Sequence, residues 1–233
     1  MGRIVVSQFI TLDGVVEDPG GSEGFERGGW AFRYERGEEG DRFKLDEVRS
    51  AQALLLGRRT YDGFAEAWPS RTGEFADKFN TMPKYVVSST LSDPEWSNST
   101  VISGDVAGGV REAAGRVDGD VLVNGSVQLV RALHEHGLVD EWRLMLYPVL
   151  LGAGKTLFGD TPEDASLRLV DSRPAGETLI EHDLVDELRL MVFPVVLGKG
   201  KRLFGETDDK KRLRLSSSTV VGDGVAIQVY TRT

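Results

Sequence analysis

The chain has 233 residues, with 28 Lys and Arg against 37 Asp and Glu, no cysteine and a net charge of −9. The absence of cysteine excludes disulfides, thiolate metal sites and cysteine nucleophiles. The acidic balance argues against a broad nucleic-acid surface, which would be basic. No apolar run approaches the roughly 20 residues that span a bilayer, and residues 1–10 lack a signal-peptide pattern. We therefore expect a cytoplasmic protein without a membrane or nucleic-acid partner.

The first half of the chain alternates strand-like and helix-like segments. Strands are predicted at residues 3–10, 53–56, 84–88 and 120–123, with a weaker one at 100–102. Helices are predicted at residues 38–51, 58–68 and 127–136, and from a cap at Asp105 to residue 117. Strands that alternate with helices indicate βαβ units, so we expect an α/β fold with a mostly parallel central sheet.

A glycine-rich polar segment, residues 17–37, separates the first predicted strand from the first predicted helix. A loop of about 20 residues is uncommon in a compact domain unless it serves a function. Two interpretations stay open: a surface excursion without a role, or a flap over a pocket with Trp30 and Phe32 as its apolar contacts.

After Gly137 the pattern changes to β-rich segments at residues 141–151, 167–172, 187–197, 213–221 and 225–231, and we expect antiparallel pairing there. Much of this part is an internal repeat. A shift of 46 residues places 135–172 over 181–218, with 23 identities in 38 positions. Two copies do not make a solenoid. We interpret the chain as one domain, 1–233, that carries a duplicated β unit.

The duplicated unit must bury its apolar face, either by extending the edge of the sheet or by pairing with a second chain. Exposed strand edges favour the second arrangement, so we expect a homodimer.

Two common site types are not supported. Gly154, Lys155 and Thr156 resemble the end of a nucleotide phosphate loop, but the first glycine of that motif would fall on Val149, and no helix start follows. His134 and His136 point to different faces of a helix, which favours solvated helix ends over a metal or general-base site. We predict no metal.

Three predicted strands end in Gly, Ser or Asn at a turn that leads onward toward a helix. The residues there are Gly57, Arg58, Arg59 and Thr60; Ser88 and Ser89; and Asn124, Gly125, Ser126, Val127 and Gln128. Helix N-termini bind anions, glycine permits close approach, and guanidinium pairs with phosphate. An ordinary βα turn explains any one of them, but three together favour a phosphate-bearing cofactor across the carboxyl edge of the sheet.

Together with Leu12, Asp13 and Gly14, these residues resemble the dihydrofolate reductase-like superfamily, and most closely the reductase domain of the riboflavin-biosynthesis deaminase-reductase. Residues 138–141 and 148–152 are similar to the C-terminal signature of that branch. The resemblance implies NADPH bound at the strand ends and hydride transfer to a small heterocycle of pterin, flavin or pyrimidine type. It also implies helices on both faces of the sheet.

By position, the resemblance assigns the turn at residues 57–60 to the cofactor phosphates and the turn at residues 124–128 to the pyrophosphate. It places Ser88 and Ser89 near the adenosine 2′-phosphate, and Ile10, Leu12 and Asp13 near the nicotinamide and the substrate. We expect Trp30 on the substrate side as well.

The catalytic carboxylate has two candidates. Counting back from Gly57, Asp41 falls where a dihydrofolate reductase carries its substrate-binding acid, although a solvated helix start explains this residue equally well. Asp13 would assist protonation of the acceptor, or would cap the turn with Gly14. The alternative function is a nucleotide- or pterin-binding protein of the same fold without turnover. A third hypothesis gives the repeat a role in assembly.

Overall fold

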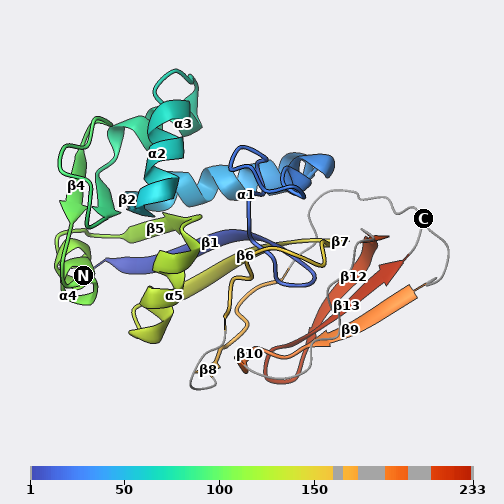
Figure 1. Ribbon diagram of the computed structural model, residues 1–233. Coiled ribbons are helices and arrows are strands. Elements are labelled where there is room, and N and C mark those ends of the chain that lie inside the picture. Colours follow the sequence, from blue (N-terminus) through green and yellow to red (C-terminus); the bar gives the residue numbers. More distant parts are fainter. Residues whose placement is uncertain (1, 160–164, 173–186, 199–210, 232–233) are drawn as a thin grey trace. The chain divides into compact units, whose positions relative to one another are not determined.

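The computed structural model describes residues 2–159, 165–172, 187–198 and 211–231 (Figure 1). The chain forms two compact units: Met1–Gln8 with Arg42–Met145, and Phe9–Asp41 with Leu146–Thr233. The interpretation of 1–233 as one domain stays a prediction. Parts of the predicted repeat lie outside the described residues, namely 160–164, 181–186 and 199–210.

A six-stranded sheet has the order β4-β3-β2-β5-β1-β6. Its strands are β1 (Arg3–Thr11), β2 (Ala51–Gly57), β3 (Lys84–Val87), β4 (Ser99–Ile102), β5 (Asp120–Asn124) and β6 (Glu141–Tyr147). The pairings that link β1 to β5, β5 to β2, β2 to β3 and β3 to β4 are all parallel. The predicted α/β fold with a mostly parallel central sheet is therefore confirmed.

Within the described residues, five α-helices accompany this sheet. They are α1 (Gly37–Ser50), α2 (Arg58–Ala67), α3 (Glu74–Thr81), α4 (Val106–Gly115) and α5 (Val127–Glu135). Asp105 caps α4 as predicted, because its carboxylate accepts the N–H of Gly108 at 3.0 Å. The sequence prediction missed α3, although Phe75, Ala76 and Phe79 have helical spacing there.

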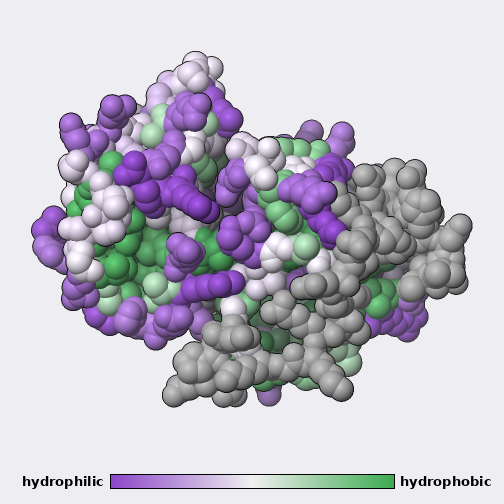
Figure 2. All heavy atoms as spheres, in the orientation of Figure 1, coloured by the Kyte–Doolittle hydropathy of each residue, from purple (hydrophilic) through white to green (hydrophobic). Residues whose placement is uncertain are grey.

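The helices α1, α2 and α3 cover one face of the sheet. The core on this face contains Val5, Leu54, Leu56 and Leu122 from the strands and Val48, Tyr61 and Phe79 from the helices. Side chains alternate along a strand, so the fully buried Leu55 and Val123 point to the opposite face, where Figure 1 draws α4 and α5. Each fully buried aliphatic side chain contributes about 1.5–3 kcal/mol. On the face shown in Figure 2, apolar side chains reach the surface near α4 and β5 among hydrophilic ones.

One charged residue, Lys84, is completely buried within the first unit. Its Nζ donates to the backbone carbonyls of Asn80, Met82 and Ser97 at 2.9–3.0 Å, and it lies 4.3 Å from the Trp96 ring centroid. Burial lowers the pKa of the Lys84 ammonium to about 8.

The C-terminal part is antiparallel, as predicted. It contains β7 (Val149–Leu150), β8 (Ala165–Ser166), β9 (Glu187–Val192), β10 (Val195–Val196), β11 (Lys211–Arg212), β12 (Arg214–Val221) and β13 (Val225–Thr231). The last two long strands and β9 form a sheet of order β12-β13-β9.

Three strand predictions in this part are wrong in detail. The segments 141–151 and 187–197 each break into two strands, at Pro148 and Pro194, because proline has no N–H for the ladder. Residues 167–172 are not a strand, since pairing there is limited to Ala165 and Ser166.

The glycine-rich segment 17–37 has a buried interior of its own. Asp18, 2% exposed, accepts the N–H groups of Glu23 and Phe25. Trp30 is fully buried in the 3-10 helix η1 (Trp30–Arg33), donates its indole N–H to the Glu17 carbonyl at 2.9 Å, and packs edge-on against Tyr147. Tight packing around Trp30 therefore orders this segment.

Within the described residues, no helix combines the length and apolar character that crossing a membrane requires.

Candidate active site

The parallel strands of the first unit bring three predicted turns to one edge of the sheet. Ser7 is the register partner of Asn124, and Gly57 is the register partner of Val87. Because parallel strands end on the same side, Ser88, Gly57 and Asn124 follow one another along the carboxyl edge. Open α/β sheets bind their ligands at this edge.

Two of these turns are joined by reciprocal hydrogen bonds. The N–H of Gly57, just before α2, donates to Ser126 Oγ at 2.8 Å. The N–H of Ser126, just before α5, donates to Thr60 Oγ1 at 3.0 Å. Neither Gly57 nor Ser126 makes a side-chain cap to its own helix. The first-turn N–H groups of both helices thus keep no intrahelical partner and lie beside two hydroxyls that still have a hydrogen to donate.

The backbone at Gly125 and Ser126 is left-handed, with φ values of 64° and 58°. A Cβ on Gly125 would stand 3.0 Å from Thr60 Oγ1, so glycine permits the close approach of the two turns. The buried Gln8 holds the turn from the other side, because its Nε2 donates to the Gly125 carbonyl at 2.6 Å. The sequence analysis did not identify Gln8, which reads there as one position of a buried strand.

Positive charge accumulates at the start of α2. Arg58 and Arg59 open this helix, and its first turn contains no acidic residue. Cations are unfavourable at a helix N-terminus, because the helix dipole is positive there. Arg58 pairs with Asp62 at 2.8 Å, whereas no ion pair is formed by the exposed Arg59 with any described residue. An anion bound at this end would relieve the repulsion.

The turn after β3 is shaped by Ser88. Its Oγ accepts the N–H groups of Thr90 and Leu91 at 3.2 and 3.0 Å, so this buried hydroxyl stabilises the turn. Ser89 is exposed at the tip. Of the two predicted 2′-phosphate residues, Ser89 has the accessible hydroxyl. Asn124, Val127 and Gln128 line the third turn, and the side chain of Gln128 is exposed.

The residues expected near the nicotinamide belong to the other unit. Asp13 accepts three hydrogen bonds there: from the N–H groups of Leu151 and Gly152 at 3.1 and 2.7 Å, and from the Thr11 hydroxyl at 2.5 Å. Both carboxylate oxygens thus stabilise local structure, which agrees with the turn-cap interpretation.

The other predicted residues of that unit have different surroundings. Asp41 is exposed near the start of α1 and pairs with Arg36 at 2.5 Å, as the solvated-helix interpretation expects. Ile10 is buried, Leu12 packs against a cluster around Leu213 and Tyr230, and Trp30 is the core residue described above. The catalytic role of the carboxylates and the substrate role of Trp30 stay predictions.

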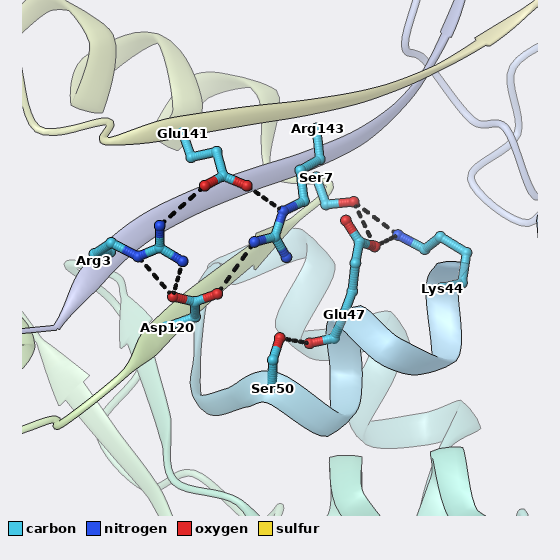
Figure 3. Close-up of polar contacts among 8 residues, drawn as sticks. All are labelled: Arg3, Ser7, Lys44, Glu47, Ser50, Asp120, Glu141 and Arg143. Carbon is cyan, nitrogen blue, oxygen red and sulfur yellow. Dashed lines mark hydrogen bonds and ion pairs between the residues drawn. The ribbon is translucent and has the colours of Figure 1, made fainter. Parts of the chain in front are cut away.

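A buried charged cluster in the first unit escaped the sequence analysis (Figure 3). Lys44 and Glu47, on the sheet-facing side of α1, form an ion pair in which the two side chains are 10% and 2% exposed. Lys44 Nζ also donates to Ser7 Oγ at 2.7 Å, and the Ser7 hydroxyl donates to Glu47 Oε2 at 3.0 Å. Glu47 Oε1 is buried without a hydrogen-bond partner among the described residues.

The cluster of Ser7, Lys44 and Glu47 lies at the carboxyl edge of the sheet. Ser7 lies directly beside Asn124 in the sheet, so the pair belongs to the same carboxyl edge as the linked turns. A sequence signal was available: Lys44, Glu47 and Val48 are spaced as one helical stripe, and all three are buried.

A second charged cluster lies at the opposite, amino end of the strands (Figure 3). Arg3 and Arg143 each bridge Asp120 and Glu141, at 2.6–3.2 Å. This closed network ties β1, β5 and β6 together. Its distance from the carboxyl edge along the strands assigns it a structural role.

A nicotinamide dinucleotide fits the residues of the carboxyl edge. The linked turns offer first-turn N–H groups of two helices, two hydroxyl donors and the exposed guanidinium of Arg59, which match the donors that a pyrophosphate requires. Glycine at position 125, where a Cβ would stand 3.0 Å from Thr60 Oγ1, lets the two turns that carry these donors come together.

Comparisons with known proteins found a sequence relative and solved structures to which this chain is similar. The chain is 26% identical to the uncharacterized protein YyaP of Bacillus subtilis (strain 168) over 176 residues, which are 73% of this chain and 88% of that protein. A putative riboflavin biosynthesis protein from Shewanella sp. PV-4 has a similar fold, with a TM-score of 0.54, 17% identity and 99% of both chains covered. Dihydrofolate reductase from Enterococcus faecalis, complexed with NADP(H) and RAB-propyl, matches with a TM-score of 0.42, 13% identity, and 100% and 97% coverage of the two chains.

A family model decides the assignment. The model of the RibD C-terminal domain matches residues 3–180, and a second match covers residues 175–227. The resemblance found in the sequence is confirmed, and the chain belongs to the RibD C-terminal domain family.

Proposed function

We propose that this protein is an NADPH-dependent reductase that transfers a hydride to a small heterocycle of pterin, flavin or pyrimidine type. The family assignment supports a reductase-type role. The observation that best supports a nicotinamide cofactor is the pair of reciprocal hydrogen bonds between the N-terminal turns of α2 and α5. These hydrogen bonds bring the backbone N–H groups of two helix N-termini and two hydroxyls close together on the carboxyl edge.

Reduction of a C=N or C=O bond consumes one hydride and one proton. The reduced nicotinamide supplies the hydride when it is bound. Thr60, Ser126 and Gly125 hold the pyrophosphate, and Arg59 and Ser89 provide the charge and hydroxyl that favour a 2′-phosphate. These contacts fix the orientation of the dinucleotide, and correct orientation at about 3–3.5 Å accounts for much of the rate.

The acceptor is assigned to the side of Lys44 and Glu47. Glu47 Oε1 is a buried acceptor that has no partner in the described part of the chain, so an N–H group on the heterocycle would satisfy it. Lys44 pairs with Glu47, and the Ser7 hydroxyl is hydrogen-bonded to both side chains. A proton can pass to the acceptor from this hydrogen-bonded set, since Lys44, Ser7 and Glu47 form one connected chain of donors and acceptors.

One observation favours the alternative, a nucleotide- or pterin-binding protein without turnover. Asp13 has both oxygens engaged by local donors, and Asp41 is exposed and paired with Arg36. If Lys44 and Glu47 do not bind the acceptor and supply its proton, neither Asp13 nor Asp41 is placed to do so instead.

The test is titration of the full chain with NADPH and with NADH, followed by addition of pterin, flavin and aminopyrimidine acceptors. We expect NADPH to bind more tightly than NADH and one acceptor class to cause loss of reduced-nicotinamide absorbance. Binding without oxidation by any acceptor would favour the non-catalytic alternative. Failure of both dinucleotides to bind would overturn both functions.

A further inference from the structure

The internal repeat has a structural counterpart in the second unit. Residues 46 positions apart are equivalent by sequence, and the family model matches the C-terminal part of the chain a second time, at residues 175–227. The first copy contributes β7 and β8, and the second contributes β10 and β11. Under the shift of 46, β7 corresponds to β10 and β8 corresponds to β11.

The two copies exchange these strands. β7 of the first copy pairs with β11 of the second, and β10 of the second pairs with β8 of the first. The registers are equivalent: Val149 opposes Arg212, and its counterpart Val195 opposes Ser166, the counterpart of Arg212. In the described residues, the short strands of each copy therefore pair with the other copy and not with their own, whereas the longer strands β6 and β9 pair with β1 and β13.

Backbone hydrogen bonds extend both exchanged ladders in the same way. The N–H of Leu213 donates to the Pro148 carbonyl at 3.1 Å. The equivalent N–H of Leu167 donates to the Pro194 carbonyl at 2.6 Å. Interchanging the two copies turns each of these hydrogen bonds into the other. Contacts of this kind are isologous: both partners use the same surface, as in a two-fold symmetric dimer.

A third contact marks the centre of the arrangement. Ser172 Oγ lies 2.9 Å from Ser218 Oγ, and these two serines are the same position of the two copies. A position that contacts its own equivalent lies at a two-fold axis. The contacts of the two copies thus have local two-fold symmetry.

The surroundings of the two copies differ. Tyr147 and Leu151 of the first copy are 4% and 0% exposed, and Tyr147 packs against Phe9 and Trp30 from the segment 9–41. The equivalent residues of the second copy, Phe193 and Leu197, are 57% and 63% exposed. The second copy is thus a β unit without the cover that a whole chain gives the first.

We propose that the duplication has placed a homodimer contact inside one polypeptide. The two copies make with each other the strand exchange that two single-copy chains would make across a two-fold axis, and the second copy occupies the place of the partner. The full chain then has this contact filled and is a monomer. This inference does not depend on the reductase assignment, and it replaces the homodimer expected from the repeat alone.

The first test uses the absence of cysteine in the chain. The double variant Ser172→Cys/Ser218→Cys is oxidised with oxidised glutathione and run on a non-reducing gel. We expect an intrachain disulfide at the mass of one chain, 25.6 kDa. The single variant Ser172→Cys should stay uncross-linked. Disulfide-linked dimers of the double variant, or two free thiols, would overturn the proposal.

The second test removes one repeat period. Deleting residues 173–218 joins Ser172 to Thr219, in the same way that Ser218 is joined in the full chain. Light scattering should give one chain mass for the full protein and two for the shortened one, and Ser172→Cys in the shortened chain should form an interchain disulfide. Glu66→Cys, on the exposed side of α2, is the control and should not cross-link.

A folded shortened chain that stays monomeric would show that the unit pairs within its own chain, against the proposal. A full chain that is dimeric would also contradict it. If the shortened chain does not fold, the gel of the double variant in the full chain decides alone.

Discussion

The buried pair of Lys44 and Glu47 makes a quantitative prediction about α1. The two side chains are 10% and 2% exposed, so removing one partner leaves an uncompensated charge in the interior. Lys44→Met or Glu47→Leu alone should therefore lower the free energy of unfolding by about 3–5 kcal/mol. This is a large part of the roughly 5–15 kcal/mol that stabilises an ordinary domain.

The double variant Lys44→Met/Glu47→Leu removes both charges together. Its stability should return to near that of the wild type, because apolar side chains of similar volume replace a buried ion pair with little net cost. If the pair serves the acceptor, this well-folded variant should still bind NADPH but lose most of its kcat/KM. Loss of activity without loss of stability separates a functional role from a structural one.

The measurements are urea unfolding and steady-state reduction of the best acceptor. The matched control is the pair Arg49 and Glu74, which includes a residue of the same helix but is exposed and so should tolerate Arg49→Met without a measurable change. Single variants at Lys44 and Glu47 that behave like this control would refute the buried-pair argument. A double variant with full kcat/KM would refute the assignment of the acceptor side.

Three further predictions concern individual residues. Burial lowers the pKa of Lys84 to about 8 in the folded protein, whereas a lysine in the unfolded chain has its ordinary pKa near 10.4, so the unfolded state binds more protons between these two pH values. The free energy of unfolding of the wild type, relative to that of Lys84→Met, should therefore rise by up to about 2 kcal/mol from pH 7.5 to pH 9.5. Urea titrations measure this difference, and a difference that does not change with pH would contradict the prediction. Asp13→Ala should lower the free energy of unfolding by about 1–3 kcal/mol for each N–H group left unpaired, and Asp13→Asn should lower it less. The NADPH affinity of both variants, measured by calorimetry, should be unchanged. An Asp13→Asn variant that keeps its stability but loses turnover would show that Asp13 is catalytic. Gly125→Ala should cost about 1–2 kcal/mol, because its φ is positive and its Cβ would meet Thr60, and should weaken NADPH binding; an unaffected melting temperature would refute the close approach.

The sequence predicted the central sheet well, because the evidence for it is local. Short β-branched and leucine-rich runs between helical stretches define β2 and β5, and Asp105 marks a helix start by its own hydrogen bond. The helix α3 was missed because it follows a proline-ended helix at a glycine without a side-chain cap. Prolines decided where the longer β segments break.

The site was predictable only in part, because much of it depends on tertiary contacts. Gly57, Thr60 and Ser126 were identified from their place after strands, but their reciprocal bonds join residues 66 and 69 positions apart. Lys44 and Glu47 look like any solvated pair on a charged helix until Ser7 is brought against them. The repeat was visible in the sequence, whereas the exchange between its copies depends on pairing that no local pattern specifies.

We propose that the linked turns at Thr60 and Ser126 hold the phosphates of NADPH. Isothermal titration calorimetry of Thr60→Val and Thr60→Ser tests it most directly, since valine keeps the shape and removes the hydroxyl while serine keeps the hydroxyl. A hydrogen bond to a charged group contributes about 1.5–3 kcal/mol, so Thr60→Val should weaken NADPH binding by about tenfold to a hundredfold, with Thr60→Ser close to the wild type. Equal affinity of all three proteins for NADPH, or no binding by the wild type, would contradict the account.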